Sequence, residues 1–150
     1  MQNLVPEFIA ILSAGLFSGA AIYINLVEHP ARMSCGIPLA ITEFAPSYKR
    51  ATIMQALLAA ISFLSSLIAW FMHSGIYWLI GGIIIGFVIP FTIIVILPVN
   101  KKLLDPSLDK NSESAKQLLI RWGTLHGVRS VFSLISFLIF LFSMIWQHRQ

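Results

Sequence analysis

The sequence predicts an all-α membrane protein in which four transmembrane helices form an antiparallel, up-down bundle. Hydrophobic residues make up 57% of the 150 residues and charged residues only 11%, whereas a soluble domain carries about 25% charged residues. The stretch from Ala51 to Asn100 contains no Asp, Glu, Lys or Arg. On a soluble protein such a stretch would form one large apolar patch. We therefore expect a single integral membrane domain over residues 1–150.

Four apolar stretches are long enough to cross a bilayer core, which needs about 20 helical residues. They run from about 6 to 27, 51 to 72, 76 to 98 and 125 to 146. Pro6 suits the first turn of a helix, where a missing N–H costs nothing. Only residues 73–75 separate the second and third stretches, so these form a tight antiparallel hairpin. The other two connections, about 28–50 and 99–124, are longer and more polar.

The basic residues favour one orientation in the membrane. Arg149 is the only Lys or Arg that falls near the outer ends of the predicted helices. The other nine lie in or beside the two long connections: Arg32, Lys49, Arg50, Lys101, Lys102, Lys110, Lys116, Arg121 and Arg129. By the positive-inside rule both connections are cytoplasmic and both termini lie outside. The expected location is the cell membrane as a multi-pass protein, which in a bacterium is the inner membrane.

Small and capping residues predict further local features. Gly15 with Gly19, and Gly82 with Gly86, have the spacing that lets helices approach closely in lipid. Ser114, followed three residues later by a Gln, reads as a capping box that begins a helix ahead of the fourth span.

Polar side chains gather where the helices meet the long connections. At the end of the first span, four of them recur at helical spacing on one face: Asn25, Glu28, His29 and Arg32. Trp122, His126 and Arg129 share a face at the start of the fourth span. Ionisable groups near hydrocarbon are costly and usually face the bundle interior. We therefore expect these two faces to meet.

The third span adds polar groups at the same depth. Pro90 and Pro98 each leave a carbonyl of the preceding turn without its donor, and Asn100 follows. Freed carbonyls at membrane depth are tolerated beside a cavity. The predicted pocket at the cytoplasmic face is formed by Glu28, His29, Asn100, His126 and Arg129. In the alternative interpretation Glu28 only neutralises Arg129, and the histidines lie at the interface with their tips in water.

Short motifs occur along nearly the whole chain. They are Ala14-Gly15-Leu16-Phe17 with Gly19-Ala20, Asn25 with Glu28-His29-Pro30-Ala31-Arg32, Pro46-Ser47-Tyr48 with Arg50-Ala51, Pro90 with Thr92, Pro98-Val99-Asn100 with Leu103-Leu104, and Arg121-Trp122 with His126 and Arg129. Together they resemble the anthrone oxygenase family, small four-span membrane proteins often described only as a domain of unknown function. For fungal members the resemblance implies an oxidoreductase that converts an anthrone to an anthraquinone with dioxygen as co-substrate, and no metal or flavin cofactor.

That reaction suggests roles for the predicted pocket. An anthrone has an acidic methylene group conjugated with its carbonyl, and its anion can pass an electron to dioxygen. His126 or His29 would act as general base, since histidine titrates near neutral pH. Glu28 would orient a histidine, and Arg129 would stabilise the enolate or superoxide. The substrate-binding candidates are Asn25, Asn100, Trp122, Tyr23 and Phe91, the three aromatic residues forming an apolar slot. The expected partners are the lipid bilayer and a hydrophobic small molecule; a homo-oligomer is left open.

Two other classes of function stay open on sequence alone. Glu28, His29 and His126 could supply a two-histidine, one-carboxylate set for iron or copper, or the two histidines could bracket a haem. A structural or transport role is the other alternative, although Glu7 and Glu28 lie at the ends of the first span rather than at its centre. The single Cys35 excludes an internal disulfide. Because the basic residues flank apolar spans, no nucleic acid partner is expected.

Overall fold

The structure is a computed structural model that describes residues 4–147, and these residues form helices joined by short connections, with no strand. The elements are α1 (Leu4–Tyr23), the π-helical turn η1 (Ile24–Glu28), α2 (His29–Ser34), α3 (Ile37–Phe71), α4 (Ile76–Phe91), the π-helical turn η2 (Thr92–Ile96), α5 (Leu97–Leu103) and α6 (Glu113–Gln147). They join into four continuous helices that are long and apolar enough to cross a membrane. The all-α prediction with four spans is confirmed. Arg149 lies outside the described residues.

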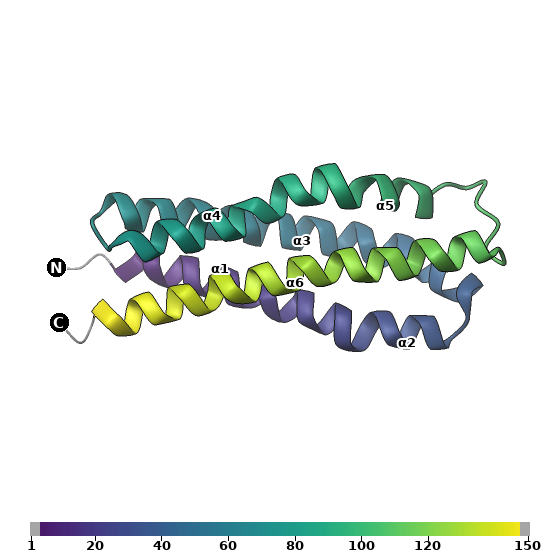
Figure 1. Ribbon diagram of the computed structural model, residues 1–150, viewed down its shortest axis with the longest axis horizontal. Coiled ribbons are helices and arrows are strands. Elements are labelled where there is room, and N and C mark those ends of the chain that lie inside the picture. Colours follow the sequence, from purple (N-terminus) through teal and green to yellow (C-terminus); the bar gives the residue numbers. More distant parts are fainter. Residues whose placement is uncertain (1–3, 148–150) are drawn as a thin grey trace.

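The four long helices lie side by side (Figure 1). α1 packs against α3 and α6, and α4 packs against the same two helices. The start of α1, the α3–α4 turn and the end of α6 lie at one end of the molecule, and α2, α5 and the start of α6 lie at the other (Figure 1). We call the second end the connection end, because both long connections lie there. That it faces the cytoplasm stays a prediction.

The predicted connections at 28–50 and 99–124 are mostly helical, so the helices continue beyond the residues predicted to lie in the membrane. The non-helical parts are only residues 35–36 and 104–112. Gly36 makes the first turn with φ of +92°, a conformation that favours glycine. At α6 the Ala115 N–H donates to Ser112 Oγ at 3.1 Å, so Ser112 caps the helix and the prediction of Ser114 was wrong. The 35 residues of α6 extend about 52 Å at about 1.5 Å each, well beyond a bilayer core.

Two π-helical turns interrupt the helices near the connection end. The His29 N–H donates to the Ile24 carbonyl, and the Leu97 N–H donates to the Thr92 carbonyl, each five residues back. In both cases the next residue is a proline, Pro30 or Pro98, which has no N–H and whose ring would clash with the carbonyl four residues earlier. The widened turn relieves that clash, and such turns are frequent at functional sites.

The side chains are arranged as expected for a chain in lipid. Large apolar side chains face outward along the helices, such as Leu64, Ile94 and Ile135, while small and polar ones are buried between them. A Cβ on Gly15 would lie 2.9 Å from the Phe137 ring of α6, and glycines on α4 lie as closely against α3. A Cβ on Gly19, in contrast, would have no neighbour within 4 Å. Of the two predicted glycine pairs, Gly15, Gly82 and Gly86 therefore take part in close helix contacts, and Gly81 does so against Phe140.

Candidate functional site

A buried histidine on α6 is held by an amide from the first long helix. Asn25, in η1, donates from Nδ2 to the Gly123 carbonyl at 2.9 Å. Its Oδ1 accepts from Ser130 Oγ at 2.6 Å and lies 2.8 Å from His126 Nδ1. His126 is only 2% exposed. Asn25 therefore connects the two helices and fixes the imidazole ring.

These contacts also determine the tautomer of His126. The Gly123 carbonyl can only accept a hydrogen bond, so the Asn25 atom facing it is the NH2 group and the other atom is the oxygen. That oxygen accepts, so His126 Nδ1 carries the proton and donates to it. Nε2 is then the unprotonated nitrogen of the neutral ring, with a lone pair available for a proton.

Arg129, one turn further along α6, is a cation without a carboxylate partner among residues 4–147. Its Nη2 donates to Gln55 Oε1 on α3 at 2.7 Å, and its guanidinium lies 5.4 Å from the centre of the Phe17 ring. Arg129 Nε and Gln55 Nε2 are buried and have no hydrogen-bond partner. Asn100 Oδ1 is another of the nine such atoms among residues 4–147, in this case an acceptor. Buried polar atoms are rarely left without a partner, so these three point to a site for a polar ligand or water.

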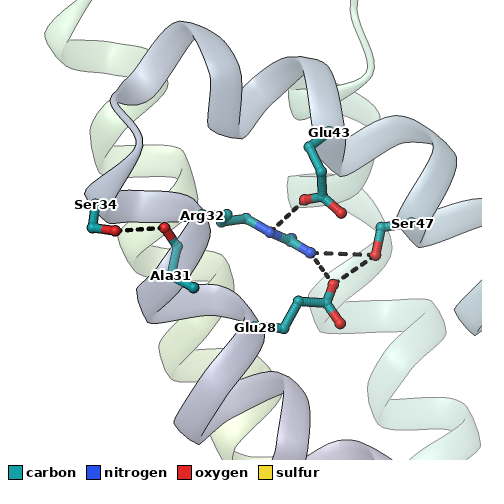
Figure 2. Close-up of polar contacts among 6 residues, drawn as sticks. All are labelled: Glu28, Ala31, Arg32, Ser34, Glu43 and Ser47. Carbon is teal, nitrogen blue, oxygen red and sulfur yellow. Dashed lines mark hydrogen bonds and ion pairs between the residues drawn. The ribbon is translucent and has the colours of Figure 1, made fainter.

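Glu28, Arg32, Glu43 and Ser47 form a charged cluster between the end of the first long helix and α3 (Figure 2). Glu28 accepts hydrogen bonds from the Arg32 guanidinium and, at 2.7 Å, from Ser47 Oγ. Arg32 Nε also pairs with Glu43 Oε2 at 2.7 Å. Glu28 thus contacts neither a histidine nor Arg129, and both sequence-based roles for it, orienting a histidine and neutralising Arg129, are corrected: the carboxylate is occupied by Arg32, one helical turn away.

Two neighbouring cavities open onto these groups. A small polar cavity of about 20 Å³, with room for about one water, is lined by residues that include Glu28, Asn100, Trp122, His126 and Arg129. A larger, mainly apolar cavity of about 210 Å³ lies between α3 and the α4–η2–α5 helix. Both cavities are lined by Tyr48, Thr52, Gln55 and Arg129. Arg129 therefore stands at the boundary between a polar and an apolar compartment.

Comparison with known families identifies the chain. The family model for anthrone oxygenase matches residues 44–139, which is most of the sequence. The chain belongs to the anthrone oxygenase family. The matched part of this anthrone oxygenase family member includes Gln55, Asn100, His126 and Arg129, whereas Asn25 and the charged cluster around Glu28 precede it or lie at its edge. Comparison with curated proteins and with solved structures gave no match.

The structure brings together four of the five residues that the sequence placed in the pocket. Glu28, Asn100, His126 and Arg129 all line the small cavity, and so does Trp122. Asn25 reaches the site through His126 rather than through the cavity wall. These four residues come from three of the four long helices and line one cavity; that this cavity is a working site stays a prediction.

Three candidates lie elsewhere. His29 packs on Trp122, with ring centres 5.2 Å apart, and its Nε2 lies against Gly123 rather than in either cavity. Tyr23 is 56% exposed on the outer surface. Phe91 packs beside Phe87 and lines neither cavity. The apolar wall is formed by other residues, among them Phe17, Ala56 and Val88.

Sequence reasoning missed Gln55, Tyr48 and Arg32 as residues lining the site. Gln55 had a usable signal, since it is the only Asn or Gln between residues 51 and 99, a region without charged residues. Arg32 was placed on the correct face but was not assigned to the site.

The proposed metal ligands do not assemble. Within residues 4–147 no group of three or more His, Cys, Asp and Glu side chains is placed to hold a metal ion. Glu28 is bound by Arg32, and Trp122 contacts the rings of both His29 and His126. The ligand set that the metal alternative requires is therefore absent from the described chain.

Proposed function

We propose that this anthrone oxygenase family member oxidises an anthrone-like or phenolic molecule with dioxygen, using its own side chains and no cofactor. The observation that carries the proposal is that His126 and Arg129 line the same small cavity, and that Arg129 also lines the adjoining apolar cavity of about 210 Å³, where the rings of a substrate would lie. The site combines an imidazole whose Nε2 is free to take a proton in the neutral form with a cation that no carboxylate among residues 4–147 pairs with. Family membership supports the reaction class, and the apolar helices suit a substrate that dissolves in the membrane.

In the first step His126 Nε2 takes a proton from the methylene carbon of the substrate. The electron pair of the broken C–H bond moves into the ring system and forms an enolate, whose oxygen Arg129 stabilises. Preorganised charges act most strongly where water is excluded. Nδ1–H keeps its bond to Asn25 throughout, so the ring holds its orientation as it becomes positively charged.

The enolate then gives one electron to dioxygen, and the resulting radical and superoxide couple to form a carbon–oxygen bond. His126 returns its proton to the peroxide oxygen. Loss of the second C–H proton forms the new carbonyl and breaks the O–O bond, and the leaving hydroxide takes up the proton as water. One anthrone and one dioxygen give one anthraquinone and one water, so atoms and electrons balance.

The test is oxygen consumption by the full chain in lipid nanodiscs supplied with an anthrone. His126→Gln should lower the rate by about 100-fold to 10,000-fold, the usual contribution of a positioned base. His73→Asn is the matched control, because His73 is exposed in the α3–α4 turn at the opposite end and Asn tolerates its positive φ of 64°. Equal rates for His126→Gln and the wild type would remove the assignment, and a loss in His29→Gln instead would move the base to that residue.

A further inference from the structure

The apolar cavity is a second compartment, which Arg129 lines and His126 does not. Phe17 of α1 forms part of its wall, with Ala56 and Ala59 of α3 and Val88 and Ile93 of the third long helix. An apolar protein cavity of about 150 Å³ is enough to bind benzene. At about 210 Å³ this cavity has room for a larger aromatic group.

The cavity opens sideways rather than along the helix axes. Thr52, Ala56 and Ile93 line it and are exposed at the molecular surface. α3 packs closely along α4 but makes few contacts with α5, so the helices separate at the level of η2. η2, the π-helical turn that ends just before Leu97 and Pro98, lies at this level.

The opening lies at a depth where the surroundings are hydrocarbon. Apart from Phe17, Tyr48 and Arg129, its lining residues fall between 51 and 100, the stretch without charged residues. The basic residues Lys49, Arg50, Lys101 and Lys102 are next in sequence on the side of the connection end. Lys and Arg favour the membrane–water interface. The opening lies on the hydrocarbon side of these basic residues, so it faces the lipid tails.

Two residues in the wall of this cavity, Gln55 and Arg129, each have a buried hydrogen-bond donor without a partner. Gln55 is 2% exposed, and its Nε2 is buried without a partner, as is Arg129 Nε. Both atoms are donors, so they require an acceptor. An oxygen on a ligand whose ring system fills the apolar cavity would supply it, and a negative charge on that oxygen would be balanced by Arg129.

We propose that the cavity between α3 and η2 binds the ring system of a membrane-dissolved aromatic molecule that carries an acceptor or anionic oxygen, and that this ligand enters sideways from the bilayer. The ring system occupies the wall around Phe17 and Ala56, and the oxygen contacts Arg129 and Gln55. As a statement of substrate class this rests on the proposed function, but binding itself does not require turnover.

Binding of naphthol and of naphthalene to the full chain in nanodiscs tests the site, with empty nanodiscs correcting for partition into lipid. Equilibrium dialysis of the nanodiscs against each compound reports occupancy. Naphthol should bind more tightly than naphthalene, and Gln55→Leu should reduce that difference. Ala56→Phe should weaken naphthol binding by roughly tenfold or more, because the added ring occupies the cavity. Leu57→Phe is the matched control, since Leu57 is 57% exposed on the same helix and does not line the cavity.

Equal naphthol affinity for Ala56→Phe and the wild type would overturn the proposal, as would an equal loss in Leu57→Phe. Entry of the ligand from the bilayer is tested separately. A spin label is attached to the cysteine of an Ile93→Cys variant in which Cys35→Ser has removed the native thiol. The label should collide with dioxygen, which concentrates in lipid, and be shielded from a water-soluble nickel chelate. Free access of the chelate would overturn entry from the bilayer. If the protein binds naphthol as described but consumes no oxygen with an anthrone, the binding proposal stands and the proposed function is wrong.

Discussion

Replacing Asn25 with leucine tests the contact that organises the site. Leucine has a similar volume but cannot bond, so three groups lose a partner: the Gly123 carbonyl, His126 Nδ1 and Ser130 Oγ. Ser130 Oγ can turn fully to the His126 carbonyl, already 3.3 Å away, and the Gly123 carbonyl lies within the continuous helix α6. The uncompensated loss is therefore the buried Nδ1–H of His126. A buried donor left unpaired costs about 1–3 kcal/mol.

We therefore expect the free energy of unfolding of Asn25→Leu, measured by detergent denaturation with circular dichroism, to fall by about 1–3 kcal/mol. Tyr23→Leu is the matched control, because it places the same residue on an outward-facing position half a turn away, where changes usually stay within about 0.5 kcal/mol. The variant should also lose activity, since neither tautomer of His126 is then favoured by a partner. Wild-type stability of Asn25→Leu, or an equal loss in Tyr23→Leu, would refute the assignment of Asn25 as the link between the helices.

Three further predictions follow from the packing and the site. Gly15→Ala should lower the free energy of unfolding by about 1–3 kcal/mol, because the new methyl would lie 2.9 Å from the Phe137 ring, whereas Gly19→Ala should be neutral or stabilising; detergent denaturation compares the two. Ser112→Ala should cost about 1 kcal/mol through loss of the α6 cap, and hydrogen exchange should localise the change to the first turn of α6; unchanged protection there would contradict it. Arg129→Gln should reduce anthrone-dependent oxygen consumption by about 100-fold, and a rate equal to that of the wild type would show that the cation is not used.

The candidate site shows how far sequence reasoning extended. Glu28, Asn100, His126 and Arg129 could be placed together because each follows or begins an apolar span at the same depth. Their partners could not be predicted. Helical spacing put Glu28 and His29 on one face, but the extra residue in the turn of η1 rotates the chain that follows, so that Arg32 reaches the cavity and His29 packs on Trp122.

The sequence by itself determined that the chain is helical, that it has four spans, and that polar groups gather at one end. These properties depend on hydropathy along the chain, since each span must satisfy its own backbone hydrogen bonds in lipid. Only the tertiary structure decided that Asn25 holds His126, that Arg32 neutralises Glu28 and leaves Arg129 with Gln55, and that a cavity opens between α3 and η2. Those outcomes depend on which side chains meet across helices, and the local pattern of residues does not encode the small rotations that two π-helical turns impose.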